Sequence, residues 1–118
     1  MSFSEILKKA TEEIKGSMGA VIVGMDGIVV EEYLAVPGID LQSISAEYGN
    51  ILKEVQSASA SLQLGDAEEL AIQTENNGIV IRKINKDYFI AILLSPNAIL
   101  GKGRFVARVA VNQLQKEF

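Results

Sequence analysis

Residues 20–30 have the sequence AVIVGMDGIVV, in which two apolar runs are separated by Met25-Asp26-Gly27. Asp-Gly between apolar runs is a strong signal for a tight β-hairpin, because both residues tolerate a positive φ. The sequence therefore predicts a buried strand over Ala20–Val23 that pairs with a second strand over Ile28–Val30.

A helix is predicted on each side of this hairpin. The first is capped by Ser4 and stopped by Gly16, and its apolar residues recur at spacings of four and three: Phe3, Leu7, Ala10 and Ile14. The second is the longest in the chain. It runs over Leu41–Leu62, with Asp40 as its N-cap and Gly65 as a C-cap candidate.

The second half of the chain predicts three strands and a last helix. Asparagine-rich turns separate the strands, and the last of the three is apolar on both faces, which indicates a central position in the sheet. Ser95-Pro96 is a typical helix start, and the helix continues to about Lys116. The predicted strands are Glu69–Thr74, Ile79–Ile84 and Tyr88–Leu94.

The order of elements is thus α-β-β-α-β-β-β-α, and it predicts one domain over residues 1–118. Because hairpins join most of the strands, we expect an antiparallel sheet with helices packed on its faces, an α+β sandwich.

The composition excludes much of the chemistry of small enzymes. The 118 residues include no histidine, cysteine or tryptophan. The chain therefore has no side chain that titrates near neutral pH without a strong shift, no thiolate and no common zinc, haem or iron–sulfur ligand set. We expect no catalytic residue, no metal and no cofactor, and we favour a non-catalytic protein. The lack of cysteine fits a reducing, cytoplasmic location.

Charge narrows the range of partners. The formal net charge of −4 argues against nucleic acid as the main partner. The charge is unevenly spread, at −9 over residues 1–78 (4 basic, 13 acidic) and +5 over residues 79–118 (7 basic, 2 acidic). The longest apolar run, Tyr88–Leu94, is far too short for a membrane span. No signal peptide is visible at the N-terminus.

Three motifs have a structural and a functional interpretation. Glu31-Glu32 and Glu68-Glu69 are carboxylate pairs, but neighbours in a strand point to opposite faces, so solvated charges are the better interpretation. Gly101-Lys102-Gly103 lacks the rest of a nucleotide-binding fingerprint. Close packing of the last helix on the sheet explains its glycines, and a phosphate held by Lys102 and Arg104 is the alternative.

The long helix predicts two contact surfaces. Its aliphatic stripe is expected to cover the protein's own sheet: Leu41, Ile44, Tyr48, Ile51, Leu52, Val55 and Leu62. A second row is expected to admit the same helix of a partner, although a solvent-exposed face of small residues is the alternative. This row consists of Ala46, Gly49, Lys53, Gln56 and Ala60. A hydrophobic fraction of 48% also favours a homodimer.

Several segments together resemble a known family. They begin with residues 19–23 and Asp26-Gly27-Ile28 of the first hairpin, and continue through the long helix. They end with residues 64–70, residues 74–78 and Asn97-Ala98-Ile99-Leu100-Gly101. In order and spacing the chain resembles Roadblock / dynein light chain domains, and within them the bacterial MglB-like branch.

This resemblance implies a five-stranded antiparallel sheet of the profilin-like type. It also implies a homodimer in which the strand at residues 67–74 pairs with its copy, so that Glu69, Ala71 and Gln73 join the dimer interface. Family members bind small Ras-like GTPases as scaffolds or as stimulators of GTP hydrolysis, without donating an arginine finger. Lys53 and Gln56 are the expected GTPase-facing residues. The alternative function is a small-molecule-sensing profilin-like domain that binds a metabolite between sheet and helix.

Overall fold

The computed structural model describes all 118 residues and contains three helices and five strands. The chain order agrees with the order expected from the sequence. The elements are α1 (Phe3–Glu13), β1 (Ser17–Gly24), β2 (Val29–Leu34), α2 (Leu41–Ser61), β3 (Glu69–Gln73), β4 (Gly78–Lys83), β5 (Tyr88–Leu94) and α3 (Leu100–Leu114).

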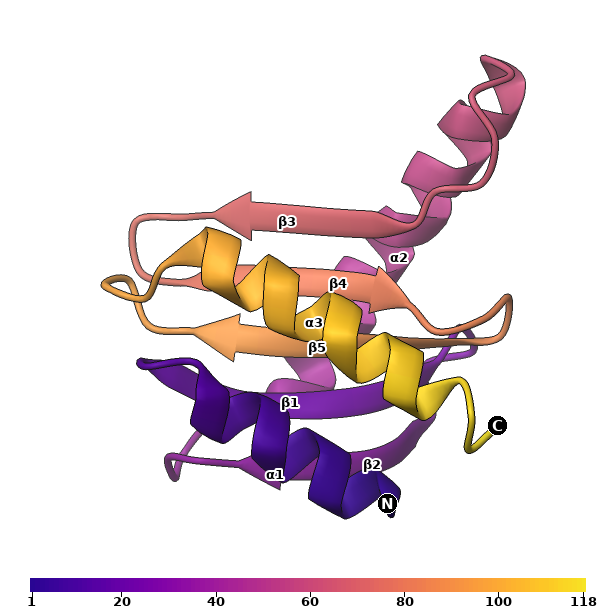
Figure 1. Cartoon of the computed structure of the whole chain (residues 1–118). Helices are drawn as coiled ribbons and strands as arrows, with labels where there is room; N and C mark the ends of the chain where they lie inside the picture. Colours follow the sequence, from indigo (N-terminus) through magenta and orange to yellow (C-terminus); the bar gives the residue numbers. More distant parts are fainter.

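The strands form one antiparallel sheet in the order β2-β1-β5-β4-β3. Figure 1 shows α1 and α3 lying across one face of the sheet and α2 crossing the opposite face. The expectation of an α+β fold with helices on both faces is therefore confirmed. The two edge strands are β2 and β3.

The alternation of side chains along the strands builds two separate cores. On the face covered by α1 and α3, residues such as Ile22, Ile90 and Ile92 belong to a cluster of 16 buried residues. On the face covered by α2, Val21, Phe89 and others form a cluster of nine. The single helix α2 thus covers one face of the sheet, whereas α1 and α3 share the opposite face, which is equally wide. None of the three helices is both long and apolar enough to cross a membrane.

The first helix begins two residues earlier than the sequence suggests. Ser2, and not Ser4, is the N-cap: its Oγ accepts a hydrogen bond from the backbone N–H of Glu5 at 3.1 Å. The Glu5 carboxylate in turn accepts one from the Ser2 backbone N–H at 3.2 Å. This reciprocal capping box needs an acidic residue three positions after the cap, which Ser2 has and Ser4 lacks.

The long helix begins as expected, with Asp40 accepting a hydrogen bond from the Ser43 backbone at 3.1 Å. Its end differs from the expectation. The N–H of Leu64 bonds to the carbonyl of Ser59 at 2.9 Å, which together with the Gln63 N–H to Ala60 bond makes a Schellman motif. The left-handed residue of this motif is Gln63, with φ 58°, so Gly65 does not cap the helix.

The last helix begins at Leu100, later than the Ser95-Pro96 start expected from the sequence. Ser95 instead opens a turn: its carbonyl accepts a hydrogen bond from the Ala98 N–H at 3.1 Å, and its own N–H donates to Gly16 at 2.8 Å. This turn fastens the β5–α3 connection to the α1–β1 connection. A cap sequence is therefore not sufficient to start a helix where the chain is already held in a turn.

Candidate functional site

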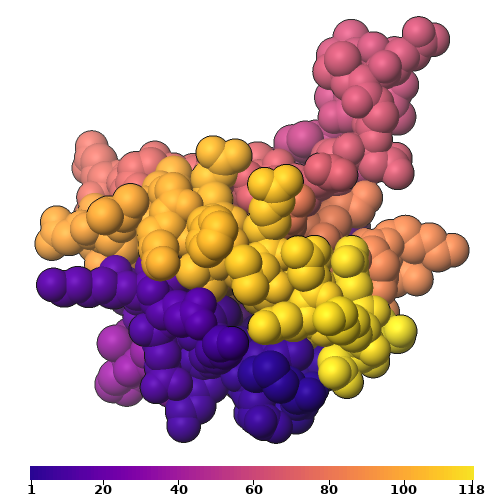
Figure 2. Space-filling view, viewed as in Figure 1, coloured from indigo at the N-terminus to yellow at the C-terminus, as the bar shows by residue number.

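The most unusual feature of the surface is the C-terminal half of α2. Figure 1 shows this half extending past the edge strand β3, and Figure 2 shows its tip standing clear of the body of the molecule. Residues 60–66, at the tip and in the connection that follows, are all exposed. A helix end with no support from its own chain indicates a surface that another molecule covers.

The face of α2 that contacts the sheet combines two leucines with two small residues. Its fully buried members are Leu41, Ser45, Gly49 and Leu52. A Cβ placed on Gly49 would lie 2.9 Å from the Cζ of Phe89 in β5. Gly49 therefore lets α2 approach its own sheet, and the prediction that it lies on a row facing a partner helix is wrong.

The sheet covers the aliphatic row of α2 only in part, contrary to expectation. Leu41 and Leu52 face the sheet and are buried. The other residues of the row lie on the side of the helix next to that face and are half-buried or exposed. Ile51 is 39% exposed and Leu62 is 68% exposed, while Ile44, Tyr48 and Val55 are half-buried. We call these five residues together with strand β3 the α2–β3 surface.

Strand β3 contributes an apolar face and a free edge to this surface. Leu70 and Ile72 point to the α2 side, where they pack half-buried against the same core as Ile44 and Tyr48. Beyond them the sheet ends, because β3 pairs only with β4. An unpaired edge beside half-exposed aliphatic side chains is a template for strand addition.

The remaining members of the small-residue row are dispersed. Ala46 and Lys53 lie on the other flank of α2, where they line a hollow of about 180 Å³ beside the β1–β2 hairpin. Ala60 is exposed at the projecting tip. Lys53 is exposed, as a residue that faces a partner would have to be.

Gln56 is engaged within the chain. Its Oε1 accepts hydrogen bonds from the Ala67 backbone N–H at 2.8 Å and from Lys83 Nζ at 3.3 Å. Its Nε2 donates to Asp66 Oδ1 at 3.1 Å. Gln56 thus holds α2 to the segment that leads into β3, and this contact fixes the angle at which the helix leaves the body.

Glu69 is also engaged, and it is more than a solvated charge. Its carboxylate accepts hydrogen bonds from Arg82 Nη1 at 3.1 Å and from Arg104 Nε at 2.7 Å, and its side chain is only 14% exposed. Its neighbour Glu68 is 81% exposed. The two carboxylates of the pair therefore have different environments, as the alternation of a strand requires.

Ala71 and Gln73, the other expected interface residues of β3, lie on the same side of the strand as Glu69. Ala71 packs half-buried against the core under α3. The Gln73 Nε2 donates to the carbonyls of Thr74 and Asn77 at 3.1 and 3.2 Å, and so it closes the β3–β4 turn.

The α2–β3 surface offers apolar contacts and edge-strand backbone groups, which serve association. No group of three or more Asp or Glu side chains in the structure could hold a metal ion. The sequence indicated α2 and β3 as the functional elements. It could not show which row of α2 is free, because that depends on where Phe89 lies beneath the helix.

Comparison with known proteins gives matches among solved structures only. No family model matches the chain, and no curated protein does. The crystal structure of MglC from Myxococcus xanthus is 29% identical, with 100% of each chain covered and a TM-score of 0.72. MglB from the same organism superposes with a TM-score of 0.87 at 11% identity, over 98% of this chain and 94% of that one.

Two further structures define the fold. A Roadblock/LC7 domain from Streptomyces avermitilis matches at 13% identity with a TM-score of 0.85, over 97% of this chain and 95% of that one. Profilin II from Acanthamoeba castellanii matches at 13% identity with a TM-score of 0.62, over 98% of both chains. The expectation of a profilin-like sheet is confirmed.

Proposed function

We propose that this chain is a non-catalytic homodimeric regulator or scaffold of a small Ras-like GTPase. The support is its confirmed resemblance to the Roadblock/LC7 family, whose fold it shares with MglB and MglC. The observation that carries the proposal is the α2–β3 surface. Ile51 and Leu62 of its aliphatic row are exposed, and the outer edge of β3 pairs with no other strand of the chain. We place its action in the cytoplasm.

Two copies related by a two-fold axis satisfy this surface. Antiparallel pairing of β3 with its copy would continue the sheet and bond the free edge. The same approach would bring the projecting half of each α2 over the other protomer, where Ile51, Val55 and Leu62 could be buried. In this arrangement Glu69, Ala71 and Gln73 lie along the seam.

The GTPase would bind to the assembled pair. The hydroxyl–carboxylate pairs of the fold, Ser2 with Glu5 and Ser43 with Asp40, are helix caps. Any stimulation of hydrolysis would therefore act by repositioning the catalytic groups of the GTPase itself. Lys53 is the exposed cation of α2 that we assign to the GTPase-facing surface. Gln56 supports that surface indirectly, through its bonds to the segment before β3.

The alternative, a sensor that holds a metabolite between sheet and helix, has less support. The hollow that lies between a helix and the sheet, beside α2 and the first hairpin, measures about 180 Å³. A larger hollow of about 520 Å³ lies instead between the α1–β1 and β5–α3 connections. Small-molecule sites are usually about 300–1,000 Å³ in volume.

Two measurements test the proposal. In sedimentation velocity at micromolar concentration the wild-type chain should have twice the mass of one chain, and Ile51→Glu with Val55→Glu should give a folded monomer. The matched control is Ser57→Glu, an exposed change on the same helix, which should remain dimeric. A monomeric wild type would refute the dimer.

The partner is tested separately. Small GTPases encoded in the genome of the source organism would be mixed with the wild type and with the Ile51→Glu/Val55→Glu variant. We expect binding by the wild type alone, with or without faster GTP hydrolysis. If no GTPase binds to a proven dimer, the dimer stands and the assigned partner is wrong.

A further inference from the structure

The outer face of α3 has exposed apolar side chains that the fold does not use. Phe105, at 60% exposure, lies on the solvent side of the helix, and Ile99, at 73%, lies at the start of the helix. Lys102 Nζ lies 5.7 Å from the centre of the Phe105 ring. Exposed aromatic side chains are enriched where proteins bind one another, and a cation over the ring face is a favourable contact.

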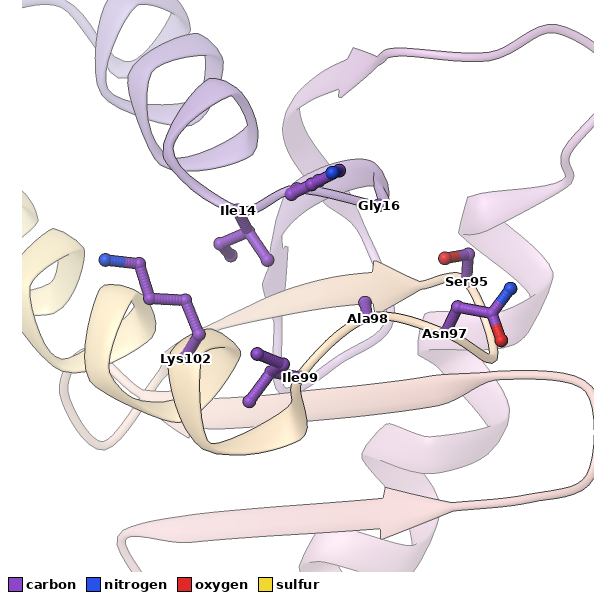
Figure 3. A pocket seen from close by; sticks show the side chains of 8 residues that line it. Ile14, Gly16, Ser95, Asn97, Ala98, Ile99 and Lys102 are labelled. Carbon is purple, nitrogen blue, oxygen red and sulfur yellow. The ribbon is translucent and has the colours of Figure 1, made fainter.

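A hollow of about 520 Å³ adjoins this face at the N-terminal end of α3. Ile14, Ala98 and Ile99 form its apolar lining, and Lys15 and Lys102 are its charged residues. Figure 3 shows Ile14 directed across the hollow towards Ala98 and Ile99, with Lys102 on the first turn of the helix. The hollow can therefore take an apolar group from a ligand whose charged parts reach the lysines.

The charge around the hollow has one sign. Residues 88–116 include no Asp or Glu, and α3 carries Lys102, Arg104 and Arg108. No acidic residue lines the hollow. Glu13 faces α3 from α1 and lies with Lys9 in the tight groove between the two helices. On the other flank of α3, Glu68 and Glu69 line a hollow together with Arg104 and Arg108, so the unopposed cations are those at the N-terminal hollow. This cationic strip belongs to a chain with a net charge of −4, so it selects for an acidic partner.

We propose that this α3 face, consisting of the hollow and the exposed row Ile99, Lys102, Phe105 and Arg108, binds an acidic peptide segment of another protein. One large apolar side chain of the segment enters the hollow. Its flanking carboxylates pair with Lys15 and Lys102 on one side and with Arg108 on the other. Arg104 contributes less, because Glu69 already holds it.

A peptide fits this face better than an anionic membrane does. A bilayer surface is broadly flat, whereas the apolar lining of this hollow is recessed and suits a single protruding side chain. The net charge of −4 also repels anionic lipid headgroups, while a peptide touches the cationic strip alone. The face lies across the sheet from α2, so the proposal depends neither on the dimer nor on the GTPase (Figure 1).

Selection from a phage library of random 12-residue peptides tests the proposal with the full chain as bait. Selected peptides should contain one large apolar residue flanked by Asp or Glu. Binding of a fluorescein-labelled selected peptide, measured by anisotropy, should weaken about tenfold or more in Lys102→Glu, a loss of about 1.4 kcal/mol. It should weaken similarly in Ile99→Ser, which removes an exposed apolar group and keeps the charge.

Lys86→Glu is the matched control, because it makes the same charge change in the exposed β4–β5 turn at the far end of the sheet. It should bind as the wild type does. The proposal fails if no acidic peptides are enriched, or if Lys102→Glu and Ile99→Ser bind them normally. It also fails if Lys102→Glu abolishes binding to phosphatidylserine vesicles, or if that variant changes the sedimenting mass. The vesicle result would assign the face to a membrane, and the change in mass would assign it to a second copy of this chain.

Discussion

At the scale of single residues, Gly49 shows how little space separates α2 from the sheet. Gly49→Ala would normally stabilise a helix by about 1 kcal/mol. Here the new Cβ would lie 2.9 Å from Cζ of Phe89, whose ring is 1% exposed, so the packed core must shift to make room. We expect a net loss of about 1–3 kcal/mol in urea unfolding, which is typical of overpacking. Phe89→Leu should recover part of the loss in the double variant.

The control for this substitution is Gly101→Ala in α3, where nothing lies within 4 Å of the new Cβ. It should be neutral or stabilising by about 0.5 kcal/mol. Equal losses at the two glycines would contradict the assigned role of Phe89. The sequence indicates that a glycine at position 49 destabilises the helix. It could not show the reason for this glycine, because Phe89, the neighbour that requires it, lies forty residues further along the chain. Close packing was also expected for Gly101, but it holds only for Gly103. A Cβ placed on Gly103 would lie 2.8 Å from Leu94 Cδ1.

Glu69 gives a second prediction at this scale. Glu69→Gln removes the charge that binds Arg82 and Arg104 at a position with only 14% exposure. We expect a loss of about 1 kcal/mol in urea unfolding, because hydrogen bonds to a partly buried charged group are stronger than those at the surface. Glu68→Gln, at a site that is 81% exposed, should change stability little. A similar loss in both variants would contradict this assignment.

At the scale of elements, the start of α2 depends on the charge of Asp40. Hydrogen bonds from the Ser43 hydroxyl and backbone hold the pKa of this carboxyl below its usual range. Because the pKa of Asp40 is lower in the folded state, its ionised carboxylate stabilises the fold fully at pH values above the pKa of Asp40 in the unfolded chain. The contribution disappears as pH falls through the folded pKa. We expect Asp40→Ala to lower the Tm at pH 7, and the difference from wild type to shrink at strongly acidic pH. A difference that grew on acidification would contradict the cap.

The elements differ in how far the sequence could predict them. Strand β5 has the bounds expected, Tyr88–Leu94, because an apolar run between two turns leaves no other place for it. The predicted start of α3 was wrong because the hydrogen bond from the Ser95 N–H to the Gly16 carbonyl joins distant segments and outweighs the local cap signal. The aliphatic row of α2 was assigned to the sheet because periodicity locates a stripe without showing what lies opposite it.

At the scale of the whole molecule, the two faces of the sheet differ in what they leave exposed. Two helices cover one face, and α3 there presents cations around isolated apolar groups. One helix covers the other face, where Ile51 and Leu62 of its aliphatic row and the outer edge of β3 remain open. We therefore infer that one molecule can hold two partners at once, a copy of itself on the α2 side and an acidic segment on the α3 side.

The proposed dimer makes a last prediction that concerns the whole molecule. If folding and association are linked, mass action stabilises the native state as the chain becomes more concentrated. The Tm of the wild type should therefore rise between micromolar and hundred-micromolar protein, while that of Ile51→Glu/Val55→Glu should stay constant.

Hydrogen exchange gives a local measure of the same linkage. Amides of Glu69–Gln73 and of the last turns of α2 should be protected in the wild type and exchange quickly in the variant, while those of β5 remain protected in both. If the Tm is independent of concentration and the β3 amides exchange quickly in the wild type, the edge is free in solution and no copy covers it.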